Sequence, residues 1–384
     1  MSGNLRSRLE RMRASTLQRT PEPGPAHTRP DDGEFPAGWS YVASGVRYAQ
    51  WRLSPIGVDI DAPVRLAAYS RRFSDETADP RRIAFFDFET TGLSGGAGTI
   101  AFLAAIGRID ETGSVLVSQF FLDDYPAERA FIQCVSDALD GVDAIATYNG
   151  SSFDMPLLLT RRAMHGLGAM PAVPHVDVLH PVRRLYRKTI GVCALSNMEE
   201  RILDAARNDD IPGAEVPDAW FDFVKKGRCA RLDRVFSHNQ LDIVSLARLF
   251  FKVGYIASGI DDDERCDMIG RAEIEARVDV ARAEETLQAA LRVGDTRATR
   301  ALMRLYRAQG RWQERHALIP LLPDDPAGLF SRSVFAERVR RDLSEALLLI
   351  LRSVSMSRTG SAMRLRAERR VERLKAMVER LSDV

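Results

Sequence analysis

The stretch from residue 83 to residue 92, IAFFDFETTG, is the feature that most limits how this chain can fold. Its apolar, Phe-rich run is bounded by Arg81 and Arg82 and by a Thr-Thr-Gly break, a pattern typical of a buried strand. Asp87 and Glu89 share one face of that strand, because side chains alternate with a period of two. Two neighbouring carboxylates in a buried setting are costly unless a cation neutralises them. Taken alone, the pair also fits a strand end with one capping and one solvated carboxylate.

The pattern around this strand predicts an α/β domain over residues 82–257. Strand patterns at 99–110 and 114–124 are separated by a Glu-Thr-Gly turn, which predicts an antiparallel meander of three strands. Helical spacing and stop signals then alternate with short strand patterns. We expect helices at 126–141, 153–166 and 229–256, and strands at 142–150 and 175–180.

The rest of the chain divides into three parts. At 384 residues the chain is longer than one ordinary core requires, which favours two domains. Residues 1–45, rich in Pro, Gly and charge, predict a disordered tail. Residues 46–81 predict short lead-in strands packed on the main domain. The pattern over 262–384 is all-helical and predicts an accessory domain, in which ALMRLYRAQGRWQERHAL resembles a tetratricopeptide-type helix hairpin.

Composition excludes several classes of protein. The chain is 45% hydrophobic and 28% charged, with a net charge of +1, so any nucleic-acid footprint must be local. The four cysteines are far apart and include no C-x-x-C pair, which predicts neither a disulfide framework nor a zinc site. The chain shows no apolar run of membrane-spanning length and no apolar signal-peptide core near its start. We therefore expect a cytoplasmic protein with no membrane partner.

Two later segments of the α/β domain carry further acidic residues. In YNGSSFD, Asp154 follows a strand pattern and begins a helix, a position that a helix cap would also explain. In HNQLD, His238 and Asp242 lie one turn apart on the same face of a helix. Each motif is weak by itself, and their occurrence in order within one domain makes the combination much stronger.

DFETTG, YNGSSFD and HNQLD resemble the three motifs of the DEDD (DnaQ-like) 3′–5′ exonuclease superfamily. Within it the chain is most similar to the YprB-like ribonuclease-H-like proteins, which also carry tetratricopeptide-like helices, and IPGAEVPDAW looks like that group too. The resemblance covers residues 82–255. It implies a ribonuclease-H-like mixed sheet flanked by helices, followed by an all-helical, tetratricopeptide-like domain.

The resemblance also implies a role for each motif residue. It makes a metal-ligand set of Asp87, Glu89, Asp154 and Asp242. Mg²⁺ and Mn²⁺ prefer such oxygen ligands, and two ions about 4 Å apart can hold both oxygens of an in-line displacement at phosphorus. Asp87 would bridge the ions, Glu89 and Asp242 would hold the ion that activates water, and Asp154 would hold the other.

Three further residues complete the expected site. Three residues separate His238 from Asp242, which is the spacing that tyrosine has in the superfamily. Two roles for His238 therefore stay open, a general base or a packed histidine that supports the site. Thr90 and Asn149 are expected to contact the substrate. Basic residues at 183–188, around Tyr186, and at 225–234 could grip phosphates, with Tyr186 stacking on a base, or could be ordinary solvated surface.

We therefore expect a divalent-metal-dependent nuclease, a 3′–5′ exonuclease acting on single-stranded ends of DNA or RNA by a two-metal mechanism. The same residues would serve endonucleolytic cleavage. The alternative is a catalytically weak or inactive nucleic-acid-binding scaffold. In either case the C-terminal helices could bind a protein partner, and residues 329–384, with thirteen basic and seven acidic side chains, could form a basic face.

Overall fold

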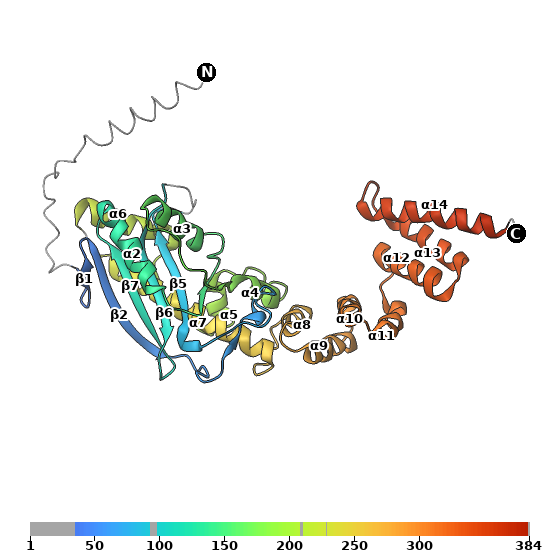
Figure 1. Ribbon diagram of the computed structural model, residues 1–384, viewed down its shortest axis with the longest axis horizontal. Coiled ribbons are helices and arrows are strands. Elements are labelled where there is room, and N and C mark those ends of the chain that lie inside the picture. Colours follow the sequence, from blue (N-terminus) through green and yellow to red (C-terminus); the bar gives the residue numbers. More distant parts are fainter. Residues whose placement is uncertain (1–34, 93–97, 208–209, 228, 383–384) are drawn as a thin grey trace, which may run out of the picture.

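The computed structural model describes residues 35–92, 98–207, 210–227 and 229–382 (Figure 1). A seven-stranded mixed sheet lies between helices, and a row of further helices extends away from it. The predicted α/β, ribonuclease-H-like sheet with an all-helical C-terminal region is therefore confirmed. The tetratricopeptide-like character of those helices stays a prediction.

The main sheet has the order β1-β2-β7-β6-β5-β8-β9. Strands β5, β8 and β9 are parallel and the other pairs are antiparallel, so the predicted β5-β6-β7 meander is confirmed. A second sheet pairs two short strands, Val64–Arg65 (β3) and Thr77–Ala78 (β4). The strands of the main sheet are Ser40–Ala43 (β1), Val46–Pro55 (β2), Ile83–Thr90 (β5), Ala101–Ile109 (β6), Ser114–Leu122 (β7), Ala144–Thr147 (β8) and His175–Asp177 (β9).

Helices of the α/β part are Glu128–Ala138 (α2), Asp154–Met164 (α3), Leu179–Tyr186 (α4), Leu195–Arg201 (α5), Val216–Lys226 (α6) and Leu232–Ser258 (α7). The C-terminal helices are Met268–Glu275 (α8), Val280–Arg292 (α9), Thr296–Ala308 (α10), Trp312–Ala317 (α11), Pro326–Phe335 (α12), Leu343–Met356 (α13) and Ala362–Ser382 (α14). Short 3₁₀ turns occupy Leu66–Ala68, Pro80–Arg82, Tyr125–Ala127, Gly213–Glu215 and Ile319–Leu321, and a π turn occupies Ala336–Arg340. Within the described part of the chain, no helix is both long and apolar enough to cross a bilayer.

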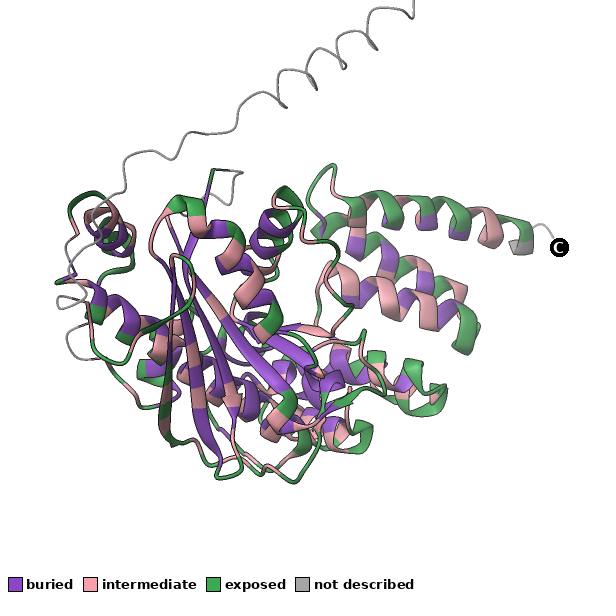
Figure 2. Cartoon of the chain, turned by 60° about the vertical axis from the view of Figure 1, so that its left-hand side comes forward, coloured by how far each residue is buried: buried purple, intermediate pink, exposed green. Residues whose placement is uncertain are grey.

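Strand β5 has a different partner on each face. Phe85 packs against Phe250 of α7, with ring centroids 5.5 Å apart, whereas Phe88 faces Phe131 of α2 at 6.4 Å. Figure 2 shows that the central strands are mostly buried between these layers. Because side chains alternate along the strand, Asp87 and the residue two further on lie on the same face as Phe85, towards α7.

A glycine brings α7 close to the sheet. A Cβ added at Gly107 of β6 would lie 2.3 Å from the Cγ2 atom of Ile243, so a larger residue there would push the helix outward. Ile243 directly follows Asp242, and Gly107 pairs with Phe85 two residues before Asp87. The small residue in β6 thus sets the distance between the α7 carboxylate and the β5 carboxylates.

The N-terminal part differs from the sequence prediction. Residues 1–34 of the expected tail lie outside the described residues, but β1 falls within the range 1–45. The rings of Phe35 and Trp39 lie 5.9 and 4.3 Å from the ring of Phe236 in α7. These two aromatic side chains attach the end of the segment to the domain, whereas its Pro-rich, charged part offers little apolar surface to bury. Strand β2 is not a short lead-in strand, because it pairs along β7 from Val46 to Pro55 and belongs to the main sheet.

The C-terminal helices join the α/β part through α8. A Cβ at Gly270 would lie 1.9 Å from the carbonyl oxygen of Arg184, so α8 can contact α4 this closely only with glycine there. The backbone N–H of Asp267 also donates to the carbonyl of Leu185 at 2.7 Å. Further along, the helices build small cores of their own, one over α8–α10 and one around Ile350.

Candidate metal centre

Acidic side chains from three elements converge above the end of β5. Asp87 and Glu89 come from β5, Asp154 is the first residue of α3, and Asp242 lies one turn after His238 on α7. Burial raises the pKa of Asp87 well above its usual value, and the negative charges of Asp242, Asp154 and Glu89 raise it further. The four carboxylates predicted as ligands are therefore close enough to repel one another.

The same repulsion acts on the other members of the cluster. The pKa of Glu89 is raised well above its usual value by burial and then by Asp242 and Asp154. Burial raises the pKa of Asp154 to about 7, although that carboxylate also accepts a hydrogen bond from the backbone N–H of Phe88. Without added positive charge, the cluster holds protons that ordinary carboxylates release.

Three ligand atoms lie together at the open side of this cluster. One atom each from Glu89, His238 and Asp242 lies within 4.8 Å of the other two. The Nε2 atom of His238 is 3.9 Å from Oε1 of Glu89 and 3.5 Å from Oδ2 of Asp242. The two carboxylate oxygens of this set, together with the raised pKa of Glu89, fit a hard divalent cation such as Mg²⁺ or Mn²⁺.

A chain of buried amides fixes the Asp87 carboxylate. The Nδ2 group of Asn239 donates to Oδ2 of Asp87 at 2.9 Å, and Gln119 of β7 donates to Oδ1 of Asn239 at 3.1 Å. Trp51 of β2 donates in turn to Oε1 of Gln119 at 3.0 Å. Both amide side chains are fully buried, so their hydrogen bonds hold one orientation. Sequence reasoning missed Gln119, which lies in none of the three motifs, whereas Asn239 lies inside the third motif, HNQLD.

Asp210 orients the histidine. Its two carboxylate oxygens lie 2.8 and 2.9 Å from Nδ1 of His238. When the Nδ1–H donates to Asp210, Nε2 is the nitrogen that faces Glu89 and Asp242. Burial alone would raise the pKa of Asp210, but the hydrogen bonds from His238 and Arg207 hold it below its usual value. Asp210 was also missed from the sequence, where its place just before IPGAEVPDAW is the only signal.

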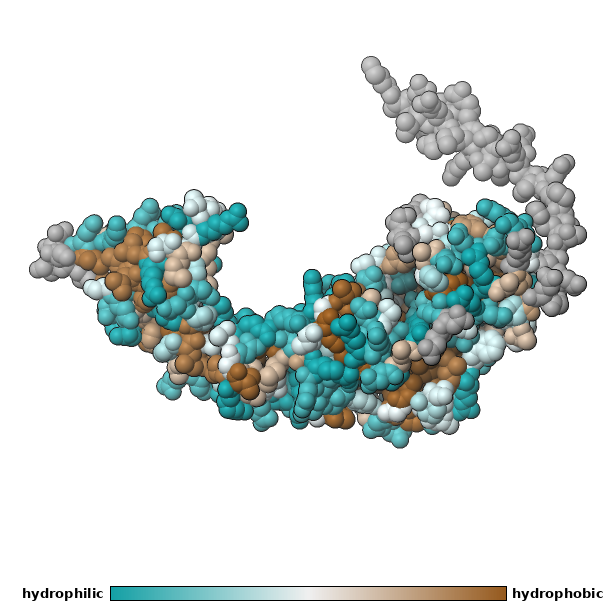
Figure 3. All heavy atoms as spheres, turned by 180° about the vertical axis from the view of Figure 1, so that it is seen from behind, coloured by the Kyte–Doolittle hydropathy of each residue, from teal (hydrophilic) through white to brown (hydrophobic). Residues whose placement is uncertain are grey.

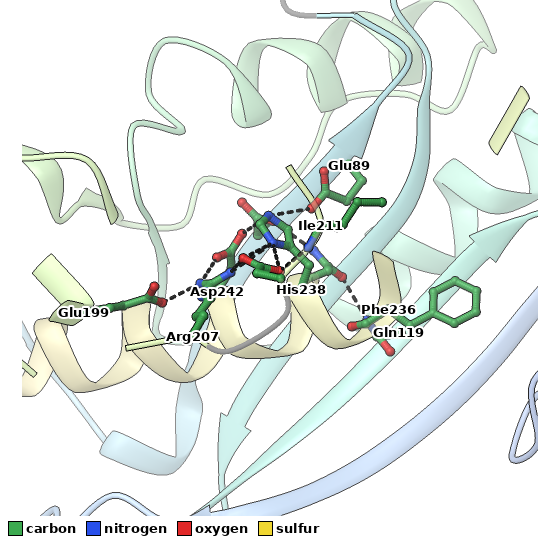
Figure 4. A network of polar contacts seen from close by, with 11 residues as sticks. Glu89, Gln119, Glu199, Arg207, Ile211, Phe236, His238 and Asp242 are labelled. Carbon is green, nitrogen blue, oxygen red and sulfur yellow. Dashed lines mark hydrogen bonds and ion pairs between the residues drawn. The ribbon is translucent and has the colours of Figure 1, made fainter. Parts of the chain in front are cut away.

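Arg207 is the third side chain of the site that the sequence prediction missed. Its guanidinium donates to the carboxylates of Glu199 and Asp242, and it also contacts Asp210 at 3.1 Å and His238 at 3.0 Å (Figure 4). Burial opposes the charge on Arg207, but these partners hold its pKa above the ordinary value. Because Arg207 takes Oδ1 of Asp242, Oδ2 is the oxygen turned towards His238.

The loop before α3 is built to seat Asp154. The backbone N–H groups of Asn149 and Ser151 donate to Asp177 at 2.9 and 3.1 Å, and Asn149 adopts a left-handed φ of 67°. A Cβ at Gly150 would lie 2.8 Å from Oδ2 of Asp154. Asp177 thus supports the loop, and it also accepts the backbone N–H of Leu179 at the start of α4.

The two residues predicted to contact substrate have structural roles of their own. The hydroxyl of Thr90 donates to the carbonyl of Gly92 at 3.0 Å. Asn149 places its backbone in the turn that Asp177 holds. Contact of either side chain with a substrate stays a prediction.

The two basic segments of the α/β part also differ from expectation. Tyr186 is buried and its hydroxyl donates to Asp263 at 3.0 Å, so the prediction that it stacks on a base is wrong. In the segment 225–234, Lys226 and Arg231 are both hydrogen-bonded to Asp222. Arg228 of that segment lies outside the described residues.

The fold and these acidic groups define a domain of the ribonuclease H class, and residues 84–253 match the sequence model of the RNase_H superfamily. Residues 84–253 therefore form an RNase H-like domain with the fold of a nuclease, and the resemblance to the ribonuclease-H-like YprB group is confirmed. It is 34% identical over 183 residues to the uncharacterized protein YprB of Bacillus subtilis (strain 168), a match that covers 47% of this chain and 44% of YprB.

A solved structure with a similar domain belongs to the family B DNA polymerase from the hyperthermophilic archaeon Pyrobaculum calidifontis. The similarity covers 56% of this chain and 30% of the polymerase, at 19% identity and a TM-score of 0.38. This chain thus spans less than half of either protein.

Proposed function

We propose that this protein is a divalent-metal-dependent nuclease that hydrolyses phosphodiester bonds of DNA or RNA, as a 3′–5′ exonuclease on single-stranded ends. The observation that carries the proposal is the convergence of Asp87, Glu89, Asp154 and Asp242 in an RNase H-like domain. The raised pKa values of Asp87, Glu89 and Asp154 mean that the folded chain holds more negative charge in one place than it can neutralise itself.

These four carboxylates would hold two Mg²⁺ or Mn²⁺ ions. When bound, such ions supply the positive charge that offsets charge on the phosphate and on the attacking and leaving oxygens. Arg207 already neutralises one side of Asp242 and keeps that carboxylate in place between α5 and α7. Asn239 carries no charge but holds the Asp87 carboxylate in place by donating to one of its oxygens.

His238 is the general base of the proposed reaction. Its Nε2 atom faces Glu89 and Asp242, where it can take a proton from the attacking water. Asp210 accepts the Nδ1–H, which holds the ring in the required tautomer and stabilises the imidazolium that forms. The close contact with Asp210 favours this role over that of a merely packed histidine.

A cleavage assay tests the proposal. Full-length protein would be incubated with 5′-labelled and 3′-labelled single strands of DNA and of RNA, with Mn²⁺, with Mg²⁺ or with EDTA. We expect a metal-dependent ladder shortening from the 3′ end, lost in Asp87→Asn and retained in Asp218→Asn, which changes an exposed carboxylate on α6. Equal cleavage by wild type and Asp87→Asn would refute the proposal.

Calorimetry separates the alternative reading. Titration of Mn²⁺ into wild type should release or absorb heat, and the Asp87→Asn titration should not. Oligonucleotide binding without any Mn²⁺ heat would favour an inactive scaffold instead.

A further inference from the structure

A groove of about 550 Å³ lies among the C-terminal helices, far along the chain from the metal centre. Helices α10, α11, α12 and α14 and the turn Ala336–Arg340 all contribute to its lining. Figure 3 shows that these helices and the sheet domain stand at opposite ends of a molecule with one broad hollow side. In Figure 1, α14 begins on the side nearer the sheet domain.

The groove is strongly basic. Its lining includes Arg307, Arg315, Arg338 and Arg366, and no Asp or Glu among the residues that the structure describes. Among the described residues, none of these four arginines has an ion-pair partner, whereas other arginines of the C-terminal helices bond to carboxylates. Four uncompensated charges around one hollow attract a polyanion.

Aromatic rings lie between these charges. Trp312 is 51% exposed, unusual for a ring of its size, and the Arg315 guanidinium lies over it at 5.8 Å from the centroid. Arg366 lies over Phe330 at 5.2 Å. Alternating guanidinium groups and rings are the two elements that hold single-stranded nucleic acid, because phosphates pair with the arginines and bases stack on the rings.

We propose that this groove, the Trp312 groove, binds single-stranded nucleic acid at a site separate from the metal centre. An acidic peptide would satisfy the arginines but would leave the exposed face of Trp312 without a stacking partner. The choice of nucleic acid rests on the proposed nuclease function, and the groove itself rests on charge and ring geometry alone.

Binding is measured in the absence of metal, in the full-length Asp87→Asn background. Fluorescence anisotropy would follow labelled dT20 and rU20 in EDTA, from low to moderate salt. In that background, Arg315→Glu/Arg366→Glu should weaken binding at least tenfold and flatten the salt dependence, since each lost phosphate contact lowers the slope by about 0.7. Trp312→Ala should weaken it about fivefold or more, and Trp312→Phe should restore part of the loss.

Arg292→Glu/Arg358→Glu is the matched control, because it makes the same charge change at two exposed arginines outside the groove, and it should leave affinity within twofold. Unchanged affinity in Arg315→Glu/Arg366→Glu would overturn the proposal. Binding of labelled poly-glutamate, with no binding of either oligonucleotide, would overturn it in favour of an acidic peptide. Because no cleavage is measured, a protein without nuclease activity could still pass this test, and an active nuclease could still fail it.

Discussion

Replacing Asp154 by Asn should stabilise the metal-free protein while weakening its response to metal. Asp154 is 5% exposed, and its pKa is about 7 rather than 3.8, because of burial first and then the charges of Asp177 and Asp242. A carboxyl with a raised folded pKa supplies stability below its unfolded pKa, and that stability is lost as the pH rises through the folded value. The loss therefore falls between about pH 4 and pH 7 and is complete at pH 8.

The size of the effect follows from the shift. About three pKa units at 1.36 kcal/mol each give an upper limit of about 4 kcal/mol. Asn keeps one oxygen to accept the Phe88 N–H, and we take about half of the limit, 2 kcal/mol, as the gain at pH 8. For a domain of this size that gain corresponds to a rise in Tm of about 4–8 °C.

Thermal melts followed by circular dichroism measure the effect. In EDTA, Asp154→Asn should melt above wild type at pH 8, and the gap should narrow at pH 5, where the native carboxyl is largely protonated. In Mn²⁺ the order should reverse, since only the intact site gains the full free energy of binding. Asp218→Asn, on the exposed face of α6, should follow wild type throughout.

A Tm of Asp154→Asn below that of wild type at pH 8 in EDTA would contradict this prediction. That result would mean that the hydrogen bonds of the carboxylate stabilise the fold more than its burial and charge destabilise it. A gap that is the same at pH 5 and pH 8 would also refute it, because the effect would then not follow protonation.

Three further substitutions probe the neighbours of this carboxylate. Arg207→Gln leaves the buried Glu199 without its cation and should lower the free energy of unfolding by about 3 kcal/mol, and Arg207→Gln/Glu199→Gln should recover most of it; strict additivity in urea unfolding would contradict the pairing. Asp210→Asn should slow cleavage about tenfold or more with Mn²⁺ affinity unchanged by calorimetry; an equal loss of affinity would place Asp210 at the metal. Gly150→Ala should lower both Tm and Mn²⁺ affinity, because its Cβ would meet the Asp154 carboxylate at 2.8 Å; unchanged values of both would show that the loop can move.

Local sequence pattern could predict the features that a single strand or helix determines by itself, such as which side chains share a face. The period of two on β5 puts Asp87 and Glu89 on one face, and the helical spacing puts His238 and Asp242 on another. Those two faces meet because an apolar sheet and an apolar helix bury each other. Gly107, which sets how closely they meet, has no local signature that separates it from any other strand glycine.

Arg207 and Asp210 could not be predicted as site residues, for a different reason. Both lie in an irregular segment between α5 and α6, where neither helical nor strand spacing says which way a side chain points. The chain is rich in arginine, so one more carries no information by itself. Tyr186 was the opposite case, because its spacing from Leu179 and Val182 already placed it on the buried face of α4.

The pairing of β2 with β7 also bears on how this domain can be cut from the chain. The superfamily match begins at residue 84, yet Trp51 of β2 ends the amide chain that reaches Asp87. A fragment beginning there would leave β7 as a long, apolar edge strand, open to pairing with a second molecule. The smallest unit that folds without aggregating should therefore begin upstream of β1, near Phe35, where the first aromatic ring reaches α7.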